Sequence, residues 1–376
     1  SRSELMSSTI VHSCGSLASA RAAHETLART SGTVRGRQRS LTVDLHCHAL
    51  TTAAEQLVAE RPQTLAERQL QPRMMGQESF NFTVNVMLKA ALPKLTTLAL
   101  RLQDMDAMGV DMQLLSPAPN QYYYWADPDL ARQLCRLIND HIASLVAQHP
   151  DRLLGLGSVA LQHPQLSIEQ LDYAVQTLGL RGVEVSSMVD GLELADPRFE
   201  PFWARVEQLG CLVFLHPLGS SLGERLNRHY LSNTIGQPLE TAVALSYLIF
   251  GGTLDRYPGV KILAAHGGGY IASYIGRSDH AWQARPDARG CRRAPSAYLR
   301  QIFFDTVVYR PEQLRHLIAE VGAGQVVVGT DYPYDMGHYD VHGLLDAVPG
   351  LSDSDRAAIL GGNAARLLNL PPRAPD

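Results

Sequence analysis

The strongest constraint on the fold is a regular alternation of short apolar runs and helical segments that begins after residue 40. Eight runs rich in β-branched and aliphatic residues recur, and stretches with helical periodicity separate them. The runs are LTVDLH (41–46), VDMQLLSP (110–117), LLGLGSVAL (153–161), GVEVSS (182–187), CLVFLHP (211–217), KILAAHGGG (261–269), IFFDTV (302–307) and QVVVGTDYP (325–333). The expected helices cover residues 127–148, 167–178, 196–208, 239–256 and 311–321, with a last one over 354–368. Because strands that alternate with helices form parallel sheets, eight such units predict an α/β fold, a (β/α)₈ barrel of the TIM type.

A doubly wound open sheet is the main alternative to the barrel. That fold requires a glycine-rich turn after the first strand, whereas the segment after Leu45 reads HCHALTT and contains no glycine. Several of the runs are apolar almost throughout, as expected for strands buried on both faces. The barrel is therefore favoured, and two long insertions, at 50–98 and 218–237, are expected on the rim at the carboxyl ends of its strands.

Residues 1–40 differ from the rest, because they are rich in Ser, Arg, Ala and Gly and the segment SGTVRGRQRS has no apolar face. We therefore predict an N-terminal extension over 1–40 and a single barrel domain over 41–376. The net charge of -4 argues against a nucleic-acid partner. The lack of an apolar run of about 18 residues argues against a membrane span. Five dispersed cysteines without a CxxC motif favour reduced thiols and a cytoplasmic location.

Ionisable side chains stand at the ends of four of these apolar runs. The first run leads into His46 and His48, the fifth into His216, the sixth into His266 before three glycines, and the eighth into Asp331. Because the carboxyl ends of barrel strands meet around one axis, these five side chains are expected to converge. An apolar strand seldom ends in an ionisable group without a functional reason, so the set indicates a metal site.

The residue types suit a divalent cation. His46 and His48 are two residues apart, so on an extended strand both imidazoles point to the same side, and the cysteine between them points to the other face. With His216 and Asp331 they offer three nitrogens and one oxygen, a set that suits Zn²⁺ and leaves a position for water or substrate. Mn²⁺ and Fe²⁺ fit the same set. His266 is expected to act as an acid or base beside the metal.

The motifs that carry these residues are VDLHCHAL, LVFLHP, AHGGGY and GTDYPY, together with RLQDMDAMGVDMQLLSPAP and GRSDHAWQARPD. With them the sequence resembles the amidohydrolase superfamily (amidohydrolase-related family 2). Within it, the similarity is to the branch that contains 2-amino-3-carboxymuconate-6-semialdehyde decarboxylase and related aromatic-acid decarboxylases. The resemblance covers residues 43–370, nearly everything after the extension.

This resemblance implies one Zn²⁺ per chain, held by His46, His48, His216 and Asp331, with His266 and Asp331 as the catalytic residues. It implies a decarboxylase (a carbon–carbon lyase) that acts on an aromatic or unsaturated carboxylic acid as its small-molecule partner. It also implies a homodimer, in which an arginine of one subunit reaches the neighbouring site. Arg285 in QARPD matches that arginine.

The sequence also departs from this branch. The family's substrate-binding arginine after the first strand has no clear counterpart, and Lys89 in NFTVNVMLK is offered in its place. Tyr334, after the DYP motif, is expected to bind substrate at the pocket edge. The aromatic residues in NQYYYWADP (120–128) either line the pocket and stack on a planar substrate or pack within a rim loop.

Two other reactions fit the same barrel. A hydrolase or hydratase would use metal-bound water with the same ligands. A dinuclear iron oxygenase would recruit His266 and Glu184 as ligands of a second metal. In dinuclear relatives a modified lysine at the end of the fourth strand commonly bridges the metals, whereas here that run reads GVEVSS and contains no lysine.

Overall fold

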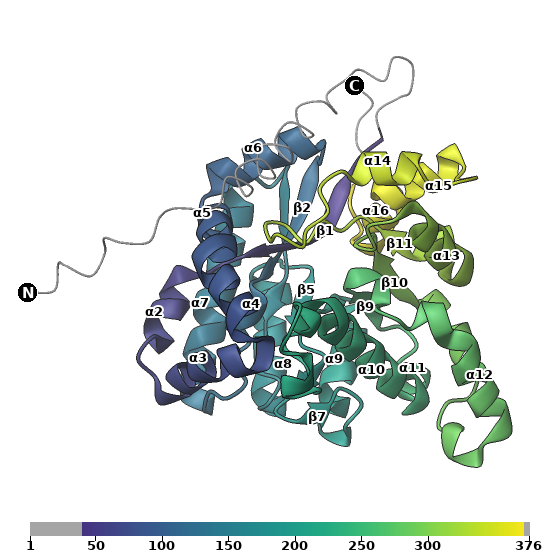
Figure 1. Ribbon diagram of the computed structural model, residues 1–376, viewed down its shortest axis with the longest axis horizontal. Coiled ribbons are helices and arrows are strands. Elements are labelled where there is room, and N and C mark those ends of the chain that lie inside the picture. Colours follow the sequence, from purple (N-terminus) through teal and green to yellow (C-terminus); the bar gives the residue numbers. More distant parts are fainter. Residues whose placement is uncertain (1–39, 372–376) are drawn as a thin grey trace, which may run out of the picture. The chain divides into compact units, whose positions relative to one another are not determined.

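The structure is a computed structural model that describes residues 40–371 (Figure 1). The predicted extension over residues 1–40 therefore lies, except for Ser40, outside the described residues. Strands occupy the centre of the barrel domain and helices surround them (Figure 1). None of the helices within residues 40–371 combines the length and the apolar character that crossing a membrane requires.

The predicted strands all form, and they pair in parallel around a closed barrel. Hydrogen-bonded neighbours follow the order β1-β2-β3 and β4-β5-β8-β9-β10-β11, and β3 and β4 are two pieces of one strand on either side of Leu156. The last strand returns to the first, because the Leu45 amide donates to the Val328 carbonyl at 2.9 Å and Cys47 pairs with Tyr332. The strands are β1 (Val43–Ala49), β2 (Met112–Pro117), β3 (Leu153–Gly155), β4 (Gly157–Ser158), β5 (Gly182–Val185), β8 (Leu212–Leu215), β9 (Lys261–Ala264), β10 (Ile302–Asp305) and β11 (Val326–Val327). The (β/α)₈ prediction is thus confirmed.

Helices form over the six ranges that the periodicity indicated, although Gly251 and Gly252 interrupt the one predicted over 239–256. A short antiparallel hairpin, β6 (Met188–Val189) with β7 (Leu192–Glu193), adds to the rim. The helices are α2 (Thr52–Val58), α3 (Pro62–Met75), α4 (Gln77–Phe82), α5 (Leu88–Thr96), α6 (Leu98–Met108), α7 (Pro128–Gln148), α8 (Pro164–Asp172), α9 (Glu200–Leu209), α10 (Gln237–Phe250), α11 (Thr253–Arg256), α12 (Ile275–Ala284), α13 (Pro311–Val321), α14 (Val341–Asp346), α15 (Asp353–Ala357) and α16 (Asn363–Leu367).

Local sequence explains where these helices begin and where they are interrupted. Asp127 caps α7, its carboxylate accepting from the amides of Asp129 and Leu130, and proline occupies the first helical position. The helices predicted over 167–178 and 354–368 each contain one turn of π-helix, at Tyr173–Thr177 and Ala358–Gly362. Such wide turns break the 3.6-residue period, so periodicity alone does not find them.

Successive side chains of a barrel strand point alternately toward the surrounding helices and toward the barrel interior, and β8 is an example. Val213 and Leu215 belong to the main apolar core, which includes Trp203 of α9 and Leu245 of α10. Phe214 points the other way, and its ring centroid lies 5.0 Å from that of His46. The period-2 alternation of the strand thus places the core on one face and the site on the other.

The two predicted insertions fold onto each other at the rim. The first forms α2 to α5, and the second contains a 3-10 turn at Gly223–Leu226 and a π-turn at Ser232–Gly236. Arg73 of α3 donates to Glu224 at 2.5 Å, and Asn227 donates to the Arg73 carbonyl at 3.2 Å. Gly76 permits this approach, because a Cβ there would lie 1.9 Å from the Asn227 oxygen.

Gly182→Ala should destabilise the barrel by about 3 kcal/mol, because its Cβ would lie 1.8 Å from the Leu212 oxygen in the neighbouring strand. Gly191→Ala is the matched control, since its φ is also positive at 77° but nothing lies within 4 Å of the added carbon. It should cost about 1 kcal/mol through backbone strain alone. Urea unfolding measures both losses, and equal losses would contradict the packing argument.

Candidate metal centre

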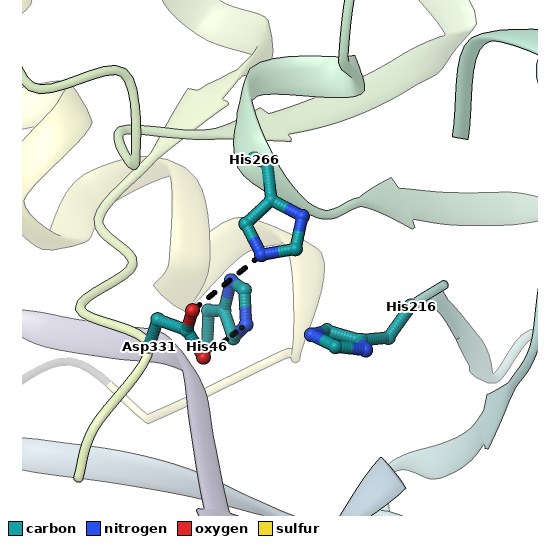
Figure 2. A group of neighbouring side chains, drawn as sticks. All are labelled: His46, His216, His266 and Asp331. Carbon is teal, nitrogen blue, oxygen red and sulfur yellow. Dashed lines mark ion pairs between the residues drawn. The ribbon is translucent and has the colours of Figure 1, made fainter. Parts of the chain in front are cut away.

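The five side chains predicted for the metal site converge at the carboxyl ends of the strands. His46 and His48 lie on β1, His216 follows β8, His266 follows β9 and Asp331 follows β11. Figure 2 shows His46, His216, His266 and Asp331 turned toward one another. One donor atom from each of these four lies within 4.8 Å of every other.

The Asp331 carboxylate lies at the centre of the histidines. Its Oδ1 is 3.2 Å from His46 Nε2 and 3.4 Å from His48 Nε2, and its Oδ2 is 3.5 Å from His266 Nε2. The ring centroid of His216 lies 4.8 Å from that of His48 and 5.0 Å from that of His46. The site therefore offers four imidazoles and one carboxylate around a single point.

Several of these nitrogen atoms lack a hydrogen-bond partner although they are buried. They are His46 Nε2, His48 Nε2, both ring nitrogens of His216, and His266 Nδ1. Buried polar atoms in proteins are almost always hydrogen-bonded, so such a cluster of unpaired ones needs an explanation. Imidazole nitrogens beside a carboxylate are the donor set of a divalent transition metal. The residues fit such a cation, and the cluster is a divalent metal site.

The shifted pKa values of Asp331 and His216 favour the protonation states that bind a cation. Burial opposes the charged form of Asp331, yet the histidines around it, His46 above all, hold the pKa of its carboxyl well below the usual range. Burial and the neighbouring imidazoles of His48 and His46 push the pKa of His216 well below its usual value. At neutral pH the metal-free site therefore contains an ionised carboxylate and a neutral His216.

His46 behaves differently in the metal-free site. Burial would lower its pKa, but the carboxylates of Asp331 and Asp305 outweigh burial and raise the pKa to about 10. The proton on His46 stabilises the metal-free fold fully below the usual pKa of 6.5, and that contribution is lost as the pH rises through about 10. A metal that binds Nε2 must displace this proton.

Asp305 is a functional residue that the sequence analysis did not identify. Its Oδ2 lies 2.6 Å from His46 Nδ1 and accepts from the His266 amide at 2.9 Å, while its Oδ1 accepts from the Gly267 amide at 2.8 Å. It thereby turns Nε2 of His46 toward the site and fixes the chain at His266. The signal was present, because Asp305 is the one acidic residue at the end of the seventh apolar run.

Glu184 and Tyr122 form a second support behind His48. Glu184 Oε2 lies 3.8 Å from His48 Nδ1, and Nδ1 also contacts Ser116 Oγ at 3.1 Å. The Tyr122 hydroxyl lies 2.5 Å from Glu184 Oε1 and 2.8 Å from the His216 carbonyl oxygen. Burial raises the pKa of Glu184. The first aromatic residue of the 120–128 run thus packs beside the metal site.

The three predicted substrate-binding residues lie in different places. Tyr334 is beside the site, with its ring centroid 5.5 Å from that of His48. Lys89 lies on α5 with an exposed side chain. Arg285 follows α12, is 67% exposed and pairs with Asp287 at 2.8 Å. Of these three residues, only Tyr334 lies next to the metal cluster.

A cavity of about 610 Å³ opens beside the cluster, and His266 and Asp331 form part of its wall. Asn233, Tyr309 and Met336 contribute to the remainder. The volume falls within the range of small-molecule sites in proteins. The cavity can therefore hold an organic molecule against the metal cluster.

The backbone around this cavity is strained. His266 and Asp331 adopt positive φ angles of 55° and 58°, and so does Tyr309, another residue of the cavity wall, at 64°. Left-handed conformations are unfavourable for residues other than glycine and persist where the surrounding structure imposes them, often at functional sites. The strain coincides here with the two residues that join the metal cluster to the cavity.

Comparison with known proteins agrees with this geometry. The family model described as amidohydrolase matches residues 43–370. A curated 2-amino-3-carboxymuconate-6-semialdehyde decarboxylase from Dictyostelium discoideum is 36% identical over 72% of this chain and 76% of its own length. A gamma-resorcylate decarboxylase from Rhodococcus jostii is 32% identical over 72% of this chain and 87% of its own. The crystal structure of 5-carboxyvanillate decarboxylase from Sphingomonas paucimobilis is 25% identical, covers 88% of this chain and 99% of its own, and superposes with a TM-score of 0.76.

Binding a divalent cation near pH 8 should release about one proton per metal, because His46 keeps its proton in the metal-free site up to a pKa of about 10. Calorimetric titration of metal-free protein in two buffers of different ionisation enthalpy measures the released protons. The affinity should rise with pH until His46 is deprotonated. Binding without proton release near pH 8 would show that His46 is neutral in the metal-free site.

Proposed function

This chain belongs to the amidohydrolase family and is a carboxy-lyase of that superfamily, and we propose that it decarboxylates an aromatic or unsaturated carboxylic acid with the help of a divalent metal. The observation that carries this function is the cluster of His46, His216, His266 and Asp331 beside an open cavity. By their names, the relatives act on acids in which the carboxylate is attached to an unsaturated carbon. That shared chemistry is what we transfer to this chain.

The residues of the site divide into ligands and a proton carrier. We propose His46, His48, His216 and Asp331 as ligands, on the strength of their unpaired nitrogens and the central carboxylate. A bound divalent cation supplies positive charge that orients the substrate and stabilises negative charge developing on it. His266 is suited to proton transfer, because its side chain is 16% exposed and contributes to the cavity wall.

The proposed reaction balances with one proton. His266 delivers a proton to the carbon that bears the carboxylate, and the π electron pair forms the new C–H bond. The C–C bond to the carboxylate then breaks, its electron pair restores the π system, and CO₂ leaves. The strained backbone at His266, together with Asp305 on its amide, holds the imidazole in place for this transfer.

We propose one Zn²⁺ per chain as the cofactor, since three imidazoles and one carboxylate are a set that zinc binds with one position left open. Manganese and iron fit the same atoms. Metal analysis of protein purified without chelator, together with reconstitution by each ion, decides between them.

The decarboxylase proposal is tested by CO₂ release from a panel of acids, namely gamma-resorcylate, 6-methylsalicylate, 5-carboxyvanillate and 2-amino-3-carboxymuconate-6-semialdehyde. We expect CO₂ from at least one acid, about one metal per chain, and no consumption of oxygen. Incorporation of labelled water into a product without CO₂ would support the hydrolase or hydratase. Close to two irons per chain with oxygen uptake would support the oxygenase.

The roles of His48 and His266 can be separated by metal content. His48→Ala should lose most of its metal, as His216→Ala and Asp331→Asn should, because each removes a proposed ligand. His266→Ala should keep its metal and lose turnover by a factor of about 100 or more. Metal per chain after gel filtration and CO₂ release are the measurements.

The opposite result for metal content would make His266 the ligand and exclude His48 from the ligand set. If His266→Ala loses its metal and His48→Ala keeps it, the ligand set is that of the four side chains in Figure 2. His163→Ala is the matched control, because His163 lies on the rim, bonded to the Ala126 carbonyl, outside the metal cluster.

We also propose Tyr334, Lys89 and Arg285 as substrate-binding residues. Proximity to His48 supports Tyr334. Lys89 and Arg285 rest on the resemblance, and Arg285 would act on the neighbouring site of a homodimer from its exposed position after α12. Light scattering on the full chain, with and without Arg285→Gln, measures the oligomeric state and its dependence on this residue.

A further inference from the structure

Arg101 is a buried cation that the proposed reaction does not use. It lies on α6, is 2% exposed, and is among the largest fully buried side chains of the described residues. Buried arginines normally face a carboxylate. Within residues 40–371, Arg101 forms no ion pair, and its hydrogen bonds go to neutral oxygens instead. The position of those oxygens indicates what this side chain does.

One end of the guanidinium binds the strand that carries two of the histidines. Arg101 Nη2 donates to the backbone carbonyl of His48, at the end of β1. A bond to the backbone of His48 restrains the peptide from which that imidazole projects. Arg101 is therefore bonded to the backbone, and not to the imidazole, of a proposed metal ligand.

The face of the same guanidinium rests on the segment that carries the carboxylate. Its central carbon lies 4.9 Å from the ring centroid of Tyr332, the residue after Asp331. Guanidinium groups over aromatic rings are attracted by the ring electrons, more strongly where water is excluded. The ring is fixed from its other end, because the Tyr332 hydroxyl donates to Asp104 at 2.9 Å.

A third contact links Arg101 to the interior of the barrel. Arg101 Nη1 donates to Gln113 Oε1 at 2.9 Å, and Gln113 Nε2 donates to Asp44 Oδ2 at 2.9 Å. Asp44 in turn accepts from the amides of His46 and Thr330, each at 3.1 Å. The side-chain amide of Gln113 thus connects the guanidinium of Arg101 to the carboxylate of Asp44. Through Asp44 this chain of hydrogen bonds extends to the backbone of β1 and of the residue before Asp331.

From these contacts we infer that Arg101 is a positioning residue for the metal centre. It holds the end of β1 and the segment after β11 at a fixed separation, so that His48 and Asp331 face one cation. A planar fork with several donors is needed for three simultaneous contacts, and lysine lacks that shape. The inference rests on the ligand set proposed above.

The test compares Arg101→Lys, which keeps the charge, with Arg101→Gln, which removes it. Zinc transfer to a chelator gives the release rate, and the absorption spectrum of cobalt-substituted protein reports the ligand geometry. Both variants should release zinc about tenfold faster or more, because the loss of a group that orients a metal ligand typically weakens metal binding by about 10-fold to 100-fold. Their cobalt spectra should change, and kcat on an acid from the panel should fall more than KM rises.

Arg152→Gln is the matched control. Arg152 also donates to backbone carbonyls, those of Val110 and Asp111, but these precede β2 at the opposite end of the barrel. This variant should lose stability and keep the zinc release rate and cobalt spectrum of the wild type. If the Arg101 variants fail to fold, Tyr332→Leu removes the aromatic face, together with the hydroxyl that binds Asp104, and should also accelerate zinc release. Zinc release at the wild-type rate from this variant would overturn the inference.

The outcomes separate this inference from the function on which it rests. Folded Arg101→Lys and Arg101→Gln proteins with the zinc release and cobalt spectrum of the wild type would overturn it. Arg101→Lys that matches the wild type while Arg101→Gln does not would also overturn it, because charge and not shape would then be decisive. A wild-type protein that binds no divalent metal would contradict the proposed function instead.

Discussion

Asp331 reaches the histidines only because the last strand closes onto the first. The seam is made by backbone hydrogen bonds: the Asp331 amide donates to the His46 carbonyl at 2.8 Å, and the His48 amide donates to the Tyr332 carbonyl at 2.9 Å. These bonds join residues almost 300 positions apart in the sequence, so the carboxylate and two of the imidazoles share one sheet edge. The site is therefore a property of the closed barrel and cannot form in any fragment that lacks either end.

Three buried acidic side chains lie around the seam between the first and last strands, and each contacts a different part of it. Asp305 faces His46, Asp44 binds the backbone on both sides of the seam, and Asp331 faces the centre. Burial raises the pKa of Asp44 to about 6, against four hydrogen-bond and charge contacts that favour its ionised form. Backbone amides hold the carboxylates of Asp305 and Asp44 in place before a metal arrives, and such preorganised support of the ligands favours tight metal binding.

The sequence predicted the barrel and the five converging side chains because both follow from simple periodicities. Strands buried on both faces leave apolar runs, and the carboxyl ends of those runs meet, so His46, His216 and Asp331 could be found without coordinates. Other features depend on contacts between distant segments. Arg101 is one of three charged residues in its helix, and only the structure shows that it reaches His48. Lys89 was offered for a family arginine that has no clear counterpart, and Arg285 was matched by resemblance; nothing in the local pattern determines where either side chain lies.

The contacts between the two rim insertions mean that the length of one insertion constrains the length of the other. Gly76 of one insertion accommodates the Asn227 backbone of the other, and Arg73 contacts both Glu224 and Asn227. A change of length in either insertion would displace the residues that the other insertion contacts. We therefore expect that an exchange of either segment requires a matching change in the other, although more than a hundred residues of sequence separate them.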